Sequence, residues 1–124
     1  MKMYDEYTKK LDDFIFSELV KIKNPVFLEF GVREGVSTKK FIELCDKNEG
    51  MTYSIDIDDC SKVSNSNKWK FIQSRDDNFE YIQKQIPEKF DAILIDSFHN
   101  AEHVKKIIYY YYDKLKEGGY MFID

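Results

Sequence analysis

The chain has 124 residues and is 43% apolar and 16% aromatic, which suits one folded domain and argues against disorder. Its net charge of -4 lacks the basic balance typical of nucleic-acid binders. The first ten residues carry acids and no apolar segment, and no apolar run approaches the roughly 18 residues of a membrane helix. Cys45 and Cys60 have no metal-like spacing and are expected to be reduced. We therefore expect a cytoplasmic protein that binds neither nucleic acid nor membrane.

Helical and strand-like patterns alternate along the chain. Apolar residues at helical spacing over 4–22 predict an amphipathic helix, which Asn24-Pro25 ends. The following patterns predict, in order, a strand at 26–30, a helix at 37–47, strands at 51–58 and 69–73, a helix at 76–86, a strand at 90–97, a helix at 104–115 and a strand at 120–124. Gly118 and Gly119 are expected to close the last helix as a C-cap pair.

Strands that alternate with helices predict a Rossmann-like, doubly wound α/β fold with a mostly parallel sheet. We expect a single domain over 1–124, in which residues 1–24 form an N-terminal helix and residues 25–124 form the α/β core. Ligands of such sheets bind beyond the carboxyl ends of the strands, where the strand order reverses. Acids lie at the predicted strand ends, whereas the strand bodies are nearly acid-free. These ends are therefore the candidate site.

The first strand end, FLEFGVREGVS, combines an acid in a buried strand with two glycines. Gly31 lets the chain turn sharply out of the strand, and Gly35 lets a ligand or the next strand approach the helix start. The N-terminus of the following helix presents unpaired N–H groups to a polar ligand. Glu29 is hard to place as a core residue, so its carboxylate could bind an ammonium group or nearby N–H groups. The alternative is a plain tight turn with a salt-bridged Glu29.

The spacing of these glycines is not G-x-G-x-x-G, so the dinucleotide fingerprint is absent. E-F-G-x-x-x-G-x-S instead resembles the first motif of the class I S-adenosylmethionine (SAM)-dependent methyltransferases, and the resemblance covers residues 26–124. It implies that Glu29, Gly31, Gly35 and Ser37 bind the cofactor, with the glycine loop under its amino-acid portion. It also implies a five-stranded sheet of order 3-2-1-4-5 with SAM over the first two strands.

Asp56 ends the second predicted strand, 21 residues after Gly35. A carboxylate at this point can accept hydrogen bonds from both ribose hydroxyls, and the matching acid of the methyltransferase family binds the ribose. Asp58 could compete for this role, and a strand-ending acid at a turn is the alternative. SRDDNF, after the third strand, resembles the region that lines the adenine, which implies Asp76 as a cofactor ligand. Asp76 and Asp77 could equally be helix N-caps.

Asp96 and His99 lie three residues apart after the fourth predicted strand. An Asp there can bind a divalent metal, and a His can take a proton from a hydroxyl near neutral pH. IDSFH resembles the IDG-x-H element of a branch that includes metal-dependent sugar O-methyltransferases. The resemblance implies Asp96 and Asp124 as Mg²⁺ ligands and His99 as the catalytic base, although Ile123 stands where that branch has another acid. In the alternative, Asp96 touches the ligand or a helix N-terminus and His99 caps the next helix.

Two features of the last predicted helix have simpler interpretations. His103 lies one helical turn after His99, and without further ligands such a pair is expected at the surface rather than on a metal. The Tyr109–Tyr112 run covers more than half of the helix circumference. Tyr111 fits the core, which leaves Tyr109 and Tyr110 partly exposed and favours a helix that packs against another element or a second chain.

We expect a SAM-dependent methyltransferase that transfers a methyl group to a small-molecule acceptor, at a hydroxyl oxygen, with Mg²⁺ as an optional second cofactor. The alternative is a catalytically degenerate module that binds SAM or another nucleoside. Methyltransferases of this type continue beyond the fifth strand, so we expect either a fragment or a minimal form completed by a partner chain. The last strand or the Tyr109–Tyr112 helix could join two copies. The missing fingerprint disfavours an NAD-linked enzyme.

Overall fold

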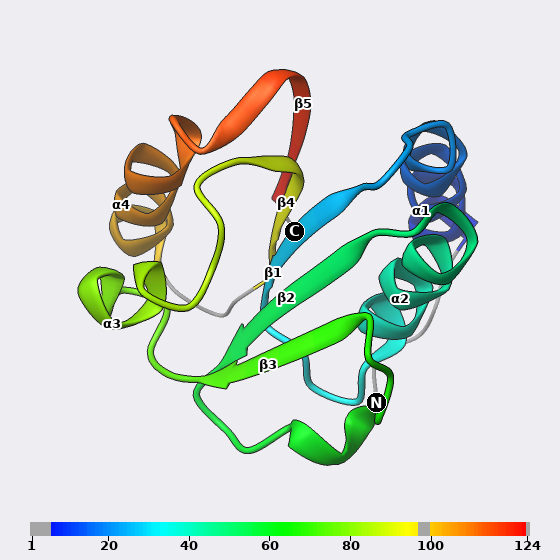
Figure 1. Ribbon diagram of the computed structural model, residues 1–124. Helices are drawn as coiled ribbons and strands as arrows, with labels where there is room; N and C mark the ends of the chain where they lie inside the picture. Colours follow the sequence, from blue (N-terminus) through cyan, green and yellow to red (C-terminus); the bar gives the residue numbers. More distant parts are fainter. Residues whose placement is uncertain (1–5, 97–99, 124) are drawn as a thin grey trace.

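A computed structural model describes residues 6–96 and 100–123 of the chain (Figure 1). Its elements follow in the order α1 (Glu6–Leu19), β1 (Val26–Phe30), α2 (Val36–Asn48), β2 (Met51–Asp56), a 3₁₀ turn (Ser61–Val63), β3 (Trp69–Gln73), α3 (Phe79–Gln83), β4 (Phe90–Ile95), α4 (Ala101–Tyr112) and β5 (Leu115–Ile123). The strands form one sheet of order β3-β2-β1-β4-β5, and every neighbouring pair is parallel. The predicted Rossmann-like architecture and its strand order are confirmed.

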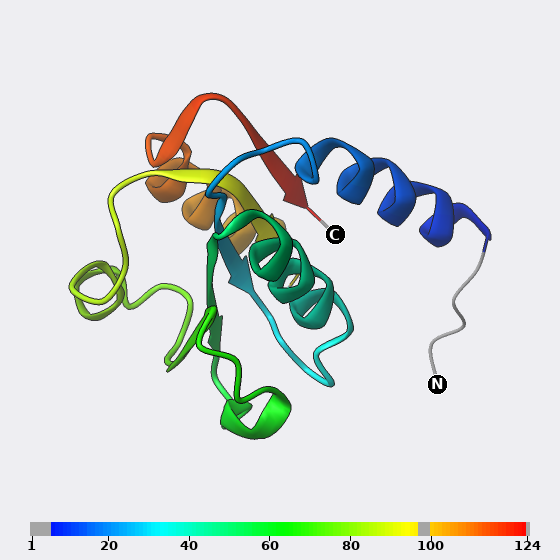
Figure 2. The same cartoon turned by 45° about the vertical axis from the view of Figure 1, so that its right-hand side comes forward.

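Helices cover both faces of this sheet, with α1 and α2 on one side and α3 and α4 on the other (Figure 1, Figure 2). Successive strand residues point to opposite faces, so Phe27 packs with the α1 and α2 side chains while Leu28 and Phe30 pack with Ile107 and Tyr111 of α4. Burial on both faces explains why β1 and β4 are nearly continuous apolar runs.

The junction of α4 and β5 differs from the sequence prediction. The helix ends at Tyr112, and Gly118 and Gly119 lie inside β5 rather than at a helix C-cap. Leu115 pairs with Phe90, but Tyr120 already pairs with Ala92, so the residues between them bulge out of the ladder. Gly118 has a φ of 78°, which a glycine adopts as readily in a bulge as after a helix. The helix-cap prediction is therefore wrong.

The tyrosines of α4 divide as the sequence analysis expects. Tyr111 is fully buried, whereas 77% of Tyr109 and 64% of Tyr112 is exposed. Tyr110 stacks on Phe79 of α3, with ring centroids 3.9 Å apart. Association of two copies through this helix or through β5 stays a prediction. Among the described helices, none has the length and apolar character that crossing a bilayer requires.

Candidate ligand-binding site

One cavity lies at the carboxyl ends of the central strands, where connections leave the sheet in opposite directions on either side of β1. Its volume is about 340 Å³. Within the described parts of the chain it is lined from four strand ends, by Phe30, Gly31, Arg33, Ile55, Asp56, Ile57, Asp58, Ser74, Arg75, Asp76 and Asp96. The fold thus brings together four of the predicted site residues: Gly31, Asp56, Asp76 and Asp96. Among the described residues, Glu29, Gly35 and Ser37 do not line this cavity.

Asp56, the predicted ribose ligand, holds the loop that follows β1. Its Oδ2 accepts the N–H groups of Val32 and Arg33 at 2.8 and 3.2 Å, and its Oδ1 accepts that of Asp58 at 2.9 Å. Burial raises the pKa of Asp56, but these N–H donors outweigh it and hold the pKa below its ordinary value. Besides these three backbone donors, the Cys60 thiol also donates to the carboxylate and lowers its pKa further. Asp56 is therefore ionised at neutral pH.

The two glycines of the β1–α2 loop meet protein groups. Gly31 has a φ of 96°, and a side chain there would overlap the backbone carbonyl of Asp96 at the end of β4. Gly35 has a φ of 88° at the N-cap of α2, and a side chain there would overlap Val63 of the 3₁₀ turn. Close approach of neighbouring segments therefore explains both glycines, without reference to a ligand.

Glu29 is fully buried beneath the loop, and its partners are hydroxyl groups rather than an ammonium or backbone N–H. Its Oε1 accepts from Thr38 Oγ1 at 2.6 Å and from Ser54 Oγ at 2.8 Å, and Trp69 Nε1 donates to Ser54. Oε2 is buried with no hydrogen-bond partner in the described part of the chain. Burial raises the pKa of Glu29 to about 7, against the lowering effect of the two hydroxyls.

Asp96 lies opposite Asp56 and forms an ion pair with Arg33. The Arg33 guanidinium is 3.3 Å from Asp96 Oδ1, and both side chains line the cavity. Sequence reasoning missed Arg33, whose φ of 54° results from the loop conformation and has no sequence signal beyond its place between two glycines. A cationic side chain on this carboxylate opposes a metal ion at the same oxygen, so the described residues around Asp96 do not fit a Mg²⁺ site. The predicted residues His99 and Asp124 lie outside the described residues.

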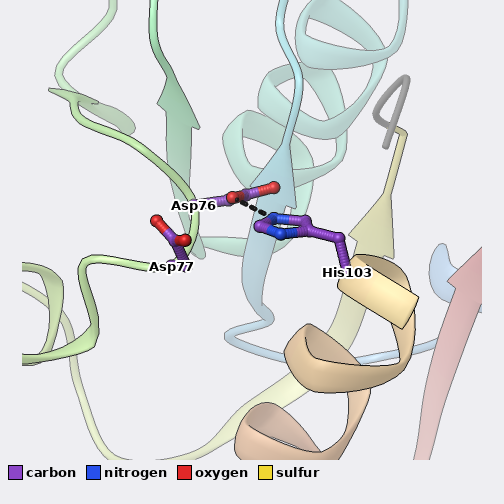
Figure 3. A group of neighbouring side chains, drawn as sticks. All are labelled: Asp76, Asp77 and His103. Carbon is purple, nitrogen blue, oxygen red and sulfur yellow. Dashed lines mark hydrogen bonds and ion pairs between the residues drawn. The ribbon is translucent and has the colours of Figure 1, made fainter. Parts of the chain in front are cut away.

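Asp76 and Asp77 follow β3, and α4 supplies a third group to them (Figure 3). Asp76 Oδ1 lies 2.7 Å from His103 Nε2, and only 15% of the His103 side chain is exposed. Asp77 binds Arg75 through both carboxylate oxygens. The N-cap of α3 is Asn78, so the alternative that Asp76 or Asp77 caps this helix is wrong. The prediction that His103 lies at the surface is wrong too. Helical spacing indicates which face of α4 carries His103, but it does not indicate that the loop after β3 covers that face.

An all-parallel sheet of this order, with a cavity at its carboxyl edge, places the chain in the class of Rossmann-like, doubly wound α/β domains. The particular family follows from a match to the family model described as "Methyltransferase domain", over residues 28–124. The chain belongs to this methyltransferase-domain family. A search of the curated proteins found no match.

Solved structures share the fold at low sequence identity. The S-adenosylhomocysteine (SAH)-bound methyltransferase PaMTH1 of Podospora anserina has a TM-score of 0.73 at 17% identity, over 92% of this chain and 51% of that one. A Staphylococcus aureus protein provisionally described as a caffeoyl-CoA O-methyltransferase has a TM-score of 0.71 at 20% identity, over 99% and 59%. A Plasmodium falciparum protein provisionally described as a ribosomal RNA methyltransferase has a TM-score of 0.67 at 20% identity, over 95% of this chain and 76% of that one. The chain thus spans little more than half the length of the first two.

Proposed function

We propose that this domain binds SAM in the cavity at the carboxyl ends of β1 to β4 and uses it for methyl transfer. The observation that carries the proposal is the convergence of Gly31, Asp56, Asp76 and Asp96, from four separate segments, on one cavity. In this arrangement the Gly31 loop receives the amino-acid portion, Asp56 the ribose and Asp76 the adenine. The family match and the SAH-bound neighbour from Podospora anserina support this choice of ligand.

The charge of the cavity favours SAM over a dinucleotide. Four aspartates line it, at positions 56, 58, 76 and 96, against two arginines, Arg33 and Arg75. Each arginine is already in an ion pair with an aspartate. The lining is thus acidic overall, which attracts the sulfonium and ammonium groups of SAM and repels the pyrophosphate of NAD.

For the reaction, we propose a small-molecule acceptor with a hydroxyl group. When bound, SAM supplies an electrophilic methyl group, and the domain has to position the acceptor and remove its proton. His99 is the proposed base, on the strength of the sequence motif alone. An acidic cavity in a chain of net charge -4 disfavours a polyanionic acceptor such as RNA. No step is assigned to a metal.

Isothermal titration calorimetry with SAH tests the ribose assignment. Asp56→Asn keeps one acceptor oxygen for the loop but loses the charge, and we expect SAH affinity to fall about tenfold or more. Asp58→Asn is the matched control from the same cavity wall, and we expect a change of less than about threefold. Melting curves of both variants show whether the domain stays folded. A larger loss of SAH affinity in Asp58→Asn than in Asp56→Asn would assign the ribose contact to Asp58. Equal SAH affinities of the wild type and both variants would refute the assignment to Asp56.

A further inference from the structure

The contact between His103 and Asp76 joins α4 to the loop after β3. Its distance is 2.7 Å, and both side chains are largely buried, with 15% of His103 and 9% of Asp76 exposed. The Asn100 side chain accepts the backbone N–H of His103 at 2.9 Å and so fixes the first turn of α4. Figure 3 shows the imidazole extending from that turn to the Asp76 carboxylate. The contact is therefore set by helix geometry rather than by a chance surface rotamer.

We propose that His103 is a positioning residue, which orients the Asp76 carboxylate for the exocyclic amino group of a bound adenine. The inference rests on the proposed function, because it assumes that the cavity holds an adenosyl ligand. Asp76 lines the cavity from the β3 end, whereas α4 contributes no described residue to its lining. His103 therefore acts through Asp76. A carboxylate held in one orientation loses less freedom when the ligand binds.

The same contact gives the site a means of base selection. An ionised carboxylate only accepts hydrogen bonds, so His103 Nε2 donates to Asp76 Oδ1 and the carboxylate presents acceptors to the ligand. The 6-amino group of adenine donates, whereas the 6-oxo group of hypoxanthine accepts and would face a negative charge. A fixed carboxylate therefore rejects hypoxanthine, and a carboxylate that can rotate away rejects it less well.

A metal site is the competing interpretation of these residues. Asp76, Asp77 and His103 each offer a ligand atom, and these atoms lie within 4.8 Å of one another. However, both Asp77 oxygens accept from Arg75, at 3.0 and 3.1 Å. The direct contact of His103 with Asp76 leaves no space for an ion between those two atoms. The described contacts favour a hydrogen-bonded pair beside a guanidinium over a cation site.

The test compares two substitutions of His103 by calorimetry, with SAH and its hypoxanthine analogue S-inosylhomocysteine as ligands. His103→Leu removes the donor, and we expect SAH to bind about tenfold more weakly and the preference for SAH over the analogue to fall about tenfold. His103→Gln places an amide N–H near the position of Nε2, and we expect it to restore both values to within about threefold of the wild type. Lys105→Leu, at an exposed position on the same helix, is the control and should change neither.

The outcomes separate the two proposals. If the folded wild type binds no SAH, the proposed function fails and the inference fails with it. If it binds SAH but His103→Leu keeps the full preference over the analogue, the positioning role alone is refuted. A uniform loss for both ligands, with no recovery in His103→Gln, would indicate a merely structural role and would also refute it. If EDTA abolished SAH binding by the wild type and Zn²⁺ restored it, the positioning role would be refuted in favour of the metal site.

Discussion

At the scale of the residue, Glu29 is the group whose chemistry depends most on the fold. It has no exposed surface, its partners are two hydroxyls, and one of its oxygens is unpartnered in the described part of the chain. Burial raises its pKa from 4.5 to about 7. Between these values the folded state binds more protons than the unfolded state, so the free energy of unfolding falls as the pH rises.

We therefore predict that Glu29 lowers stability by about 3 kcal/mol between pH 4.5 and 7, from 1.36 kcal/mol per pKa unit. The side chain at position 29 of the Glu29→Gln variant cannot ionise, so this contribution to the pH dependence should be absent. The stability of the variant relative to the wild type should therefore increase as the pH rises. Urea unfolding at several pH values, followed by the fluorescence of Trp69, the only tryptophan, measures both slopes. Asp56, Asp59 and Asp77 have lowered pKa values and titrate below this window. A difference between the two proteins that stays constant with pH would contradict the prediction.

The residues that the sequence could not reveal depend on backbone conformation. Asp56 and Asp96 are predictable because apolar periodicity locates the strand ends, and parallel strands bring those ends to one edge. Arg33 reaches Asp96 only because the loop gives it a positive φ. His103 reaches Asp76 only because Asn100 fixes where α4 begins. Neither contact has a periodic signature in the sequence.

At the scale of the element, the β1–α2 loop is held by the strands on either side of it. The Gly31 N–H donates to Ile55 of β2 at 2.8 Å, and its Cα faces the Asp96 carbonyl after β4. Two neighbouring strands thus fix the start of the loop before any ligand arrives. Gly118 in β5 shows the opposite case, because a side chain there would meet open space. Glycine thus marks a close approach of two segments in the β1–α2 loop and a bulge within β5.

Alanine substitutions at Gly31 and Gly118 should lower the free energy of unfolding by different amounts. Gly31→Ala adds both a clash with backbone and a strained φ, and we predict a loss of about 2–4 kcal/mol in the free energy of unfolding. Gly118→Ala adds only the strained φ of 78°, for which we predict about 1 kcal/mol. Urea unfolding measures both values. Equal losses would mean that the approach of β4 to Gly31 is looser than the structure shows.

At the scale of the whole molecule, the order of the strands decides where a ligand binds. β1 lies between β2 and β4, so the connection after β1 and the connection after β4 leave the sheet in opposite directions. The cavity lies between these two connections. The alternation of strands and helices predicts this architecture, and the family resemblance predicts its order. The acceptor is not predictable in the same way, because solved structures with this fold include a protein provisionally described as a caffeoyl-CoA O-methyltransferase and one provisionally described as a ribosomal RNA methyltransferase.

The central claim is that the acidic cavity is a SAM site, and calorimetric titration of the folded chain with SAH and NAD in parallel tests it most directly. We predict saturable binding of one SAH per chain and no measurable binding of NAD, because the acidic lining accepts the ammonium group of SAH and repels a pyrophosphate. A folded sample that binds neither SAH nor SAM, or that binds NAD in their place, would contradict the account.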